Sequence, residues 1–421
     1  MNLSFNLNHA DLRERAPVWL VFSLLALVPI GRLEELPLLV MAVLGGMHLW
    51  RERGAVFEDS RTRLLSVVFL AYWLPIVISC FDAAEPQKTW VLAATLPRFW
   101  LAGLFVITAL ARPGAHERLW RLTAWLLVIW SLDALLQAAV GYDVLGYPYP
   151  DERLNGVFGL HNYKLGPVLV LFSPLMIEHA RRHWPPWLTA TALATLVLVV
   201  LLTTTRIGWV MGAVVAATYF YMLARRRPKR ALAAAGVLAV VLVVAAGLAY
   251  RYSAEFHQRM DSTLMVFRGT RGGLNEALSK RLPIWRTSMR MAEDHWINGV
   301  GARSYRYVYP DYALYTDPWV NDHGTGAAYA HQMFLEIATE TGVIGLAGLV
   351  VMVVPVFLAW RRAPPERRRL MFPYLLGLGA ALFPLNSHYA IYSVFWATGL
   401  WWLTMVFAAA GPPGERAPRE L

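Results

Sequence analysis

Residues 187–202 read WLTATALATLVLVVLL and residues 231–249 read ALAAAGVLAVVLVVAAGLA, and neither stretch contains a charged side chain. About 20 apolar residues in a helix cross the hydrocarbon core of a bilayer, which is roughly 30 Å thick. Over the whole chain of 421 residues, 57% are apolar and 16% are charged, whereas a soluble domain has about 45–50% and about 25%. This composition excludes a soluble enzyme, a coiled coil and a disordered chain. It predicts an all-α polytopic membrane protein.

Apolar segments with short polar ends predict about twelve transmembrane helices. We place them at residues 17–31, 35–50, 64–81, 89–111, 119–140, 164–180, 186–205, 207–224, 231–250, 341–360, 370–386 and 389–410. The seventh and eighth are continuous in hydropathy, so the chain must fold back between them, near residues 203–208. The chain then divides into residues 1–250 with nine helices, residues 251–340 as one long loop, and residues 341–421 with three helices and a short tail.

The positive charges predict the orientation of these helices. The chain carries 39 Lys and Arg against 28 Asp and Glu, a net charge of +11. With a cytoplasmic N-terminus, the inner loops and ends hold 23 of the 39, and the short outer loops hold only Arg32 and Lys88. Short cytoplasmic loops are enriched in Lys and Arg. We therefore expect both termini in the cytoplasm and the long loop outside, and we interpret the basic excess as an orientation signal rather than a nucleic-acid signature.

Two arginines occupy positions that are costly for a charge. Arg98 follows Pro97 in the fourth predicted span, about 14 Å from its outer end. An intramembrane Arg needs an anion, carbonyl groups or a water-filled cavity, so it is either paired internally or part of an anion-binding cavity. Arg206 lies in the turn Thr-Thr-Thr-Arg-Ile-Gly-Trp, residues 203–209. It either anchors the end of a span or binds a phosphate with its forked guanidinium.

Polar residues also gather in the loop at residues 151–167, before the sixth predicted span. Its candidate binding residues are Arg153, His161, Asn162 and Lys164. Glycines at positions 156 and 159 permit tight backbone turns. Taken alone, this pattern is as typical of a structural loop as of a binding loop.

In the long loop, residues 275–298 show the apolar periodicity of an amphipathic helix. Arg281 and Trp285 are spaced i and i+4, which predicts that they share one helical face, and Arg286 follows. This basic surface either rests on anionic lipid headgroups or binds a substrate.

His331 follows a Gly-Thr-Gly loop at residues 324–326 and is expected in or near the first turn of the next helix. A helix N-terminus carries partial positive charge, which favours neutral imidazole and attracts anions. Neutral imidazole is the form that a general base requires near pH 7. The alternative is a structural histidine.

Metal ligands are sparse in this sequence. Asp317, Asp322 and His323 are spaced closely enough to hold a divalent cation, but Gly- and Asp-rich loops produce such spacing by chance, and we expect a solvated loop. The single cysteine, Cys80, excludes an intrachain disulfide and a cysteine-based metal site.

Taken together, these motifs resemble the bacterial O-antigen ligase family, which shares its membrane domain with O-antigen polymerases and protein O-oligosaccharyltransferases. The resemblance covers most of the chain and rests on loose motifs in a fixed order. They are the loop from Arg153 to Asn162, the Thr-Arg206-x-Gly-Trp turn, Arg281-x-x-x-Trp285 leading to Gly299-Val-Gly301, and His331-Gln-x-Phe-Leu followed by Glu340-Thr-Gly342-x-x-Gly345. The family often has Asn after the histidine, where this chain has Gln332.

The resemblance implies a C-type glycosyltransferase-like fold in the bacterial inner membrane with a periplasmic active site. The implied reaction moves a preassembled O-antigen glycan from undecaprenyl pyrophosphate to lipid A–core oligosaccharide, with inversion and without a metal or cofactor. The family's catalytic histidine maps onto His331, and its two functional arginines map onto Arg206 and Arg281. Candidates to bind the donor pyrophosphate or the acceptor are Arg98, Arg153, His161, Asn162, Lys164 and Arg286.

Other functions remain open at this point. An O-antigen polymerase uses the same donor but extends a second lipid-linked glycan. A protein O-oligosaccharyltransferase is disfavoured, because only residues 411–421 follow the last predicted span. A transporter or flippase of lipid-linked anions also suits twelve spans and an intramembrane Arg98. Transporters normally show inverted repeats and polar residues near the midplane, whereas the unusual polar residues here concentrate at one face.

Overall fold

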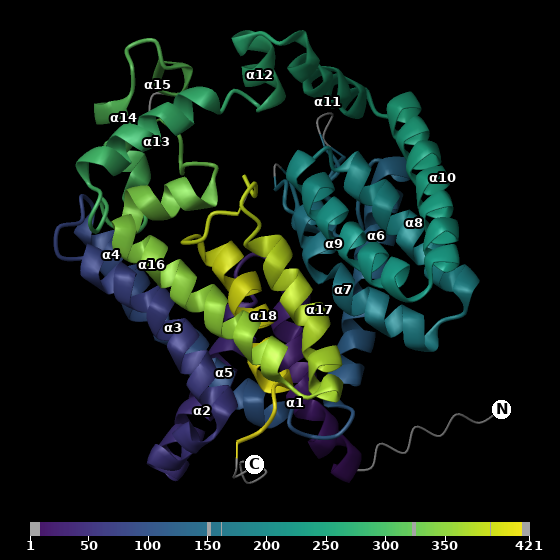
Figure 1. The fold of residues 1–421 in the computed structure, drawn as a ribbon, viewed down its shortest axis with the longest axis vertical. Coiled ribbons are helices and arrows are strands. Elements are labelled where there is room, and N and C mark those ends of the chain that lie inside the picture. Colours follow the sequence, from purple (N-terminus) through teal and green to yellow (C-terminus); the bar gives the residue numbers. More distant parts are fainter. Residues whose placement is uncertain (1–8, 150–152, 161, 322–325, 388, 415–421) are drawn as a thin grey trace.

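The computed structural model describes residues 9–149, 153–160, 162–321, 326–387 and 389–414 (Figure 1). The chain first forms α1 (His9–Ala26), α2 (Glu35–Glu52), η1 (Arg53–Glu58), α3 (Ser60–Ser79), α4 (Pro86–Thr95), α5 (Pro97–Ala109), α6 (Ala115–Val140), η2 (Gly156–Phe158), α7 (Leu165–His183), α8 (Pro186–Leu202), α9 (Arg206–Arg226) and α10 (Pro228–Tyr252). Residues 253–332, which we name the α11–α15 segment, contain α11 (Ala254–Leu264), η3 (Met265–Arg268), α12 (Arg271–Ala277), α13 (Leu282–Asp294), α14 (Tyr305–Tyr312) and α15 (Pro318–Asn321). The chain ends with α16 (Met333–Arg362), α17 (Pro365–Ala381) and α18 (Val394–Ala410).

Each of the twelve segments predicted to cross the membrane contains helix. Among the described residues, six helices are long and apolar enough to cross a bilayer: Ser60–Ser79, Pro86–Ala109, Ala115–Val140, Arg206–Arg226, Pro228–Tyr252 and Met333–Arg362. Shorter apolar helices are Arg15–Ala26, Pro186–Leu202 and Val394–Ala410. The helices α2, α7 and α17 carry charged residues in their terminal turns, which lowers their hydropathy. A polytopic all-α membrane protein is confirmed, and the number of twelve crossings stays a prediction.

Prolines divide two segments that the sequence analysis treats as continuous. The predicted span 89–111 consists of α4 and α5, which meet at Leu96, and Pro97 is the first residue of α5. The single amphipathic helix expected over 275–298 is wrong, because the chain there forms α12 and α13, with Pro283 in the first turn of α13. Proline lacks an N–H and its ring clashes with the preceding turn, so it is tolerated at the start of a helix and disrupts its interior.

The helical hairpin predicted at residues 203–208 is confirmed. Helix α8 ends at Leu202 and α9 begins at Arg206, so three threonines form the turn. Their side chains are buried: Thr203 Oγ1 donates to Val200 O (2.8 Å), and Thr205 Oγ1 donates to Thr203 O (3.0 Å).

The membrane helices approach one another closely at small residues. A Cβ atom at Gly45 of α2 would lie 1.8 Å from the carbonyl oxygen of Leu101 in α5, and one at Gly348 of α16 would lie 2.3 Å from that of Ala71 in α3. Apolar side chains gain little by leaving lipid for another helix, so membrane helices associate through such backbone contacts and van der Waals packing. The glycines therefore fix α2 against α5 and α16 against α3.

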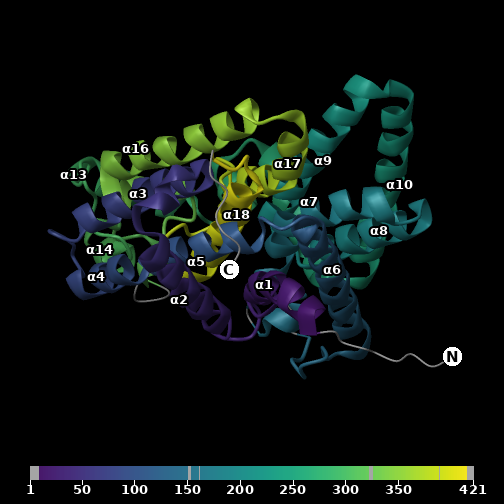
Figure 2. The same ribbon diagram turned by 90° about the horizontal axis from the view of Figure 1, so that it is seen from below.

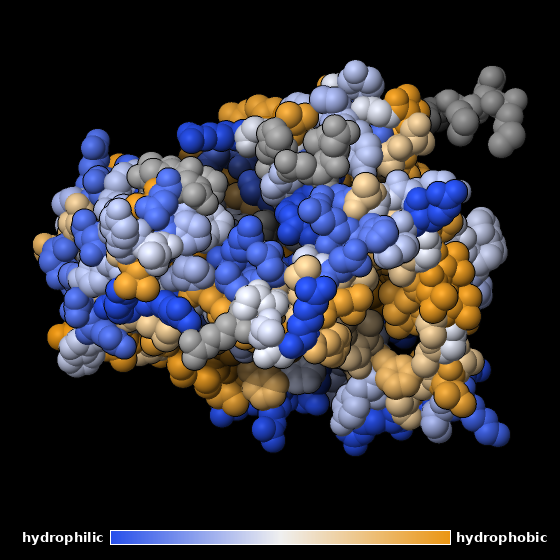
Figure 3. All heavy atoms as spheres, turned by 90° about the horizontal axis from the view of Figure 1, so that it is seen from above, coloured by the Kyte–Doolittle hydropathy of each residue, from blue (hydrophilic) through white to orange (hydrophobic). Residues whose placement is uncertain are grey.

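The helices form one bundle with a polar cap at one end. Viewed from below, α8–α10 stand on one side and α2–α5 with α16 on the other, with α6, α7, α17 and α18 between them (Figure 2). The α11–α15 segment lies at the upper end in Figure 1, whereas α1 begins and α18 ends at the lower end. Seen from above, hydrophilic residues gather over this upper end and hydrophobic residues show along the flanks (Figure 3).

Candidate active site

A backbone ladder, made of residues 296–301 and 339–344, connects the α11–α15 segment to α16. Its four hydrogen bonds run from Val300 N to Thr339 O (2.8 Å), from Gly301 N to Glu340 O (3.1 Å), from Val343 N to Trp296 O (2.8 Å) and from Ile344 N to Ile297 O (3.2 Å). The ladder joins the chain just beyond α13 to a kink within α16.

Two glycines make this ladder possible. Gly342 has φ +61° and divides α16 at the kink, and Gly299 has φ +70°. A Cβ atom at Gly342 would lie 2.2 Å from Ile297 O, and one at Gly299 would lie 2.2 Å from the carbonyl carbon of Glu340. A side chain at either position would be strained and would collide with the opposite backbone. This explains why both sequence motifs contain glycine at these positions.

The Glu340 carboxylate holds the chain that follows the ladder. Its side chain is 3% exposed, Oε2 accepts the backbone N–H of Arg303 (2.8 Å), and Oε1 accepts that of Tyr305 (3.3 Å). On the other side, Ala84 N donates to Val300 O (2.9 Å) and Thr89 Oγ1 donates to Ala302 O (2.9 Å). The ladder is thus anchored both to α16 and to the start of α4.

His331 lies immediately before the N-cap of α16. The N-cap is Gln332, whose Oε1 accepts Leu335 N (2.6 Å) and whose Nε2 donates to Pro384 O (3.1 Å). Gln332, which stands where the family often has Asn, therefore still caps the helix with a side-chain amide. His331 has φ +50°, and its ring lies 3.9 Å from that of Tyr329 and 6.3 Å from that of Trp319. Positive φ is uncommon outside glycine and is costly, so the surrounding structure must hold His331 in place.

Arg281 is the N-cap residue of α13 rather than an interior residue of one long helix. The two preceding residues, Ser279 and Lys280, have φ +56° and +59° and form a left-handed turn. The side chain of Asn275 supports the turn by accepting Leu282 N (3.2 Å). Arg281 Nη1 donates to Ser387 Oγ (2.5 Å), in the connection between α17 and α18.

Arg153, Arg206 and Arg281 lie close enough together for their charges to influence one another. Burial lowers the pKa of Arg281, the Arg206 and Arg153 charges lower it further, and Tyr329 acts in the opposite direction. Burial also raises the pKa of Tyr329, as does the Glu336 charge, against the influence of Arg281. Because arginine stays protonated in proteins, these influences on the pKa show only that the charged groups lie near one another. No ion pair between a described carboxylate and Arg153, Arg206 or Arg281 is formed, and an anion would relieve the repulsion among them.

Arg206 is the first residue of α9 and binds the α11–α15 segment. Its Nη1 donates to Ala277 O and to Ser279 Oγ (3.0 Å), and its Nη2 donates to Ser262 Oγ. Its Nε is buried and has no hydrogen-bond partner. Arg206 therefore positions the turn that precedes Arg281, and it has one donor left toward the cluster.

The loop that carries Arg153 is held by α6. Gln137 Oε1 accepts Gly156 N (2.8 Å) and Asn155 N (3.3 Å). The Arg153 guanidinium stacks on the Tyr163 ring at 4.2 Å, and its Nε is buried without a hydrogen-bond partner. Arg153 is near enough to Arg206 and Arg281 for its charge to lower the pKa of both.

The remaining residues predicted in this loop have different surroundings. Lys164 Nζ lies over the Phe395 ring at 3.9 Å. The Asn162 side-chain oxygen is buried and has no hydrogen-bond partner. His161 lies outside the described residues.

Two further predicted binding residues do not join the cluster. Arg98 binds Glu35 through Nε (3.1 Å) and Nη2 (2.9 Å), and its Nη1 donates to Thr95 O (2.5 Å). Of the two alternatives for Arg98, internal pairing and an anion-binding cavity, the structure shows internal pairing. Arg286, in the second turn of α13, is exposed to solvent.

The solvated loop expected around Asp317 is wrong for that residue. Asp317 is 3% exposed, and its carboxylate accepts Tyr309 Oη (2.8 Å) and Trp319 N (2.9 Å). These bonds tie α14 to α15, so the carboxylate has a structural role. Asp322 and His323, the other members of that cation hypothesis, lie outside the described residues.

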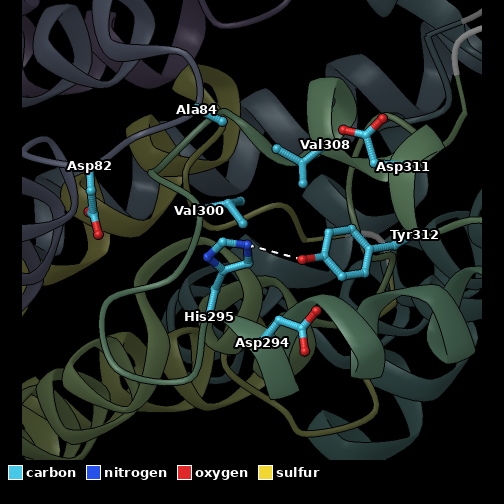
Figure 4. Close-up of a pocket in the computed structure, with 8 residues that line it drawn as sticks. All are labelled: Asp82, Ala84, Asp294, His295, Val300, Val308, Asp311 and Tyr312. Carbon is cyan, nitrogen blue, oxygen red and sulfur yellow. Dashed lines mark hydrogen bonds between the residues drawn. The ribbon is translucent and has the colours of Figure 1, made fainter.

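A separate cavity of about 540 Å³ lies at the opposite end of α13 from Arg281 (Figure 4). Its polar lining includes Asp82, Asp294 and Asp311, with His295 Nε2 3.2 Å from Tyr312 Oη. Helix α13 has 13 residues, so its two ends are about 20 Å apart. Acidic side chains repel anions, and this cavity is therefore a poor phosphate site.

Sequence reasoning missed four polar residues that lie around the candidate site. Tyr329 contacts His331, Ser387 binds Arg281, Gln137 holds the Arg153 loop, and Glu336 is a buried carboxylate one turn inside α16. Each lies next to a motif residue or inside an apolar helix. A polar side chain in an apolar helix, such as Gln137 in α6, is the signal that points to such an anchor.

Comparison with known proteins identifies one family. Residues 191–350 match the family model described as O-antigen ligase. The matched range begins in α8 and ends in α16, so it includes Arg206, Arg281 and His331 and excludes Arg153. No curated protein matches the chain.

Alanine should lower stability at Gly342, which the ladder requires, and should be tolerated at Gly379. Gly342→Ala should lower the free energy of unfolding by about 2 kcal/mol or more, because a left-handed alanine and a backbone collision both oppose it. Gly379→Ala should leave stability unchanged or raise it by up to about 1 kcal/mol, since Gly379 faces open space on α17. Denaturant unfolding of both variants in the same detergent measures this, and equal stabilities would contradict the ladder.

Proposed function

Because residues 191–350 match the O-antigen ligase family model, we propose that the chain is a ligase that completes lipopolysaccharide. In this proposal it transfers O-antigen glycan from undecaprenyl pyrophosphate to lipid A–core oligosaccharide, in the bacterial inner membrane and at its periplasmic face, with both termini cytoplasmic. The observation that carries the proposal is that Arg281 lies within electrostatic range of Arg153, Arg206 and Tyr329, and that the Tyr329 ring contacts that of His331.

The arginine cluster suits the leaving group of this reaction. When the bond from the anomeric carbon to the phosphate oxygen breaks, the oxygen keeps the electron pair and the pyrophosphate gains negative charge. Guanidinium groups bind phosphate oxygens through paired hydrogen bonds. Preorganised charges at a site of developing charge lower the barrier. We assign this role to Arg281 and Arg206, with Arg153 beside them, and the scheme requires no metal or cofactor.

His331 suits the role of general base. An acceptor hydroxyl attacks the anomeric carbon from the face opposite the pyrophosphate, and its proton passes to an imidazole nitrogen of His331. One bond forms as the other breaks, so the anomeric configuration inverts. The contact with Tyr329 orients the ring. The donor arrives from the bilayer, and Arg206 begins α9 at the end that the proposed orientation places at the periplasmic face.

Lipopolysaccharide from a strain lacking the gene tests the reaction class. A ligase is expected to leave bare lipid A–core and polymerised glycan still on its carrier lipid, because the glycan is complete but has no route to the core. Gel electrophoresis of lipopolysaccharide and analysis of the carrier lipid measure this. Core that bears a single repeat would instead identify a polymerase, and single carrier-linked units stranded on the cytoplasmic side would identify a flippase.

Removal of the proposed base should slow the transfer reaction strongly. We expect His331→Ala to lower the rate at which purified protein joins glycan to lipid A–core by about 100-fold or more, the range typical of general-base catalysis. His295→Ala, in the same segment but in the acidic cavity, is the matched control and should retain the wild-type rate. Full activity of His331→Ala would refute the assignment of the base.

The forked geometry of Arg281 gives a second test. Arg281→Lys keeps the charge but loses the paired hydrogen bonds, and we expect the transfer rate to fall about tenfold or more. Arg286→Lys makes the same chemical change on the exposed surface of α13 and should have no effect. If both variants transfer glycan at the wild-type rate, bidentate binding of pyrophosphate by Arg281 is wrong.

A further inference from the structure

A second cavity, of about 580 Å³, lies at the end of the bundle opposite the α11–α15 segment. It is lined by the beginning of α1, the first turns of α6 and the end of α7. Figure 2 shows α1 and α6 side by side at this end, and the two helices are in contact. None of its lining residues belongs to the candidate active site. With the proposed orientation of the chain, the cavity opens at the cytoplasmic leaflet.

The cavity has unneutralised positive charge. Arg118 and Arg121 line it from α6, and neither forms an ion pair or hydrogen bond with a described residue. Glu117 also lines the cavity, but it pairs with Arg182 (3.4 Å), and the neighbouring Glu178 pairs with Arg181 (2.6 Å). An anion is therefore the ligand that this cavity favours.

A buried histidine supplies a polar group that lacks a partner. His179 lines the cavity, is 6% exposed, and has an Nδ1 atom without a hydrogen-bond partner among the described residues. Its ring packs against those of His183 (4.8 Å) and Trp184 (5.7 Å). A buried nitrogen without a partner is unfavourable. A phosphate oxygen in the cavity would supply the missing hydrogen bond.

The wall beyond the cavity is apolar and faces outward. Trp125 lines the cavity and begins a stripe on α6 whose members are between 43% and 65% exposed: Trp125, Ile129, Leu132, Leu136 and Val140. Their spacing places them on one face of the helix, over about 22 Å. Trp125 and Trp184 lie 5.2 Å apart at the rim, and Trp is enriched where a membrane helix meets the headgroups. Such a stripe suits acyl chains.

We propose that this cavity binds the phosphate headgroup of an anionic phospholipid, with the acyl chains lying along the α6 stripe. The basic residues and His179 contact the phosphate, and the stripe distinguishes a lipid from a free phosphate ion. Basic pockets between membrane helices on the cytoplasmic side are a known mode of lipid binding. The site is separate from the arginine cluster and does not depend on the proposed transfer reaction.

Lipid binding to the full chain in maltoside detergent tests this site. The probes are dioctanoyl phosphatidylglycerol, dioctanoyl phosphatidylcholine and inorganic phosphate at equal ionic strength, and the readout is the Kd from the rise in Tm. We expect phosphatidylglycerol to stabilise the wild type more than the other two probes. The double variant Arg118→Gln/Arg121→Gln should bind it about tenfold more weakly or worse, because charge-assisted hydrogen bonds are lost. If the double variant is unfolded, Arg121→Gln alone takes its place.

The matched control is Arg225→Gln/Arg226→Gln, which removes two exposed arginines from the last turn of α9, away from the cavity. It should keep the wild-type Kd. Equal Kd values for the cavity variant and the wild type would overturn the proposal. So would inorganic phosphate or phosphatidylcholine that stabilises the wild type as well as phosphatidylglycerol does.

Discussion

The backbone ladder between residues 296–301 and 339–344 is the constraint on which the rest of the α11–α15 segment depends. It holds the C-terminal end of α13 against the kink in α16, and α13 packs along α16. Arg281 precedes α13 and His331 precedes α16, so one junction determines where both helices begin relative to each other. Without the kink at Gly342, α16 would continue straight and the junction would not form.

Charge is distributed unevenly around this junction. Arg153, Arg206 and Arg281 lie near one another and form no ion pair with a carboxylate of the described residues, whereas Asp82, Asp294 and Asp311 line a cavity at the far end of α13. Like charges in a partly buried cluster destabilise the folded chain. The chain offsets this cost with hydrogen bonds, since Arg206 donates to backbone and hydroxyl oxygens of the α11–α15 segment. A cluster arranged in this way is ready to accept an anion with little reorganisation.

Much of this organisation could be predicted from the sequence, because hydropathy and charge act locally. The uncharged stretches predicted the all-α membrane fold, and the threonine turn at 203–205 predicted the hairpin that places Arg206 at the start of α9. The glycines 299 and 342 were visible as motif residues, but the reason for them is a contact across about 40 residues that periodicity does not report. Glu35 could not be identified as the partner of Arg98 for the same reason, because the two residues lie on different helices. Pro97 and Pro283 each mark the start of a helix, and hydropathy alone does not show these breaks because it is continuous across them.

The most direct test of the account is an experimental structure of the chain in a lipid nanodisc with undecaprenyl pyrophosphate bound. We expect density for the pyrophosphate among Arg153, Arg206 and Arg281, close to the ring of His331. The polyprenyl chain should run into the bilayer beside α9. Pyrophosphate bound elsewhere, with the three arginines contacting only protein, would contradict it.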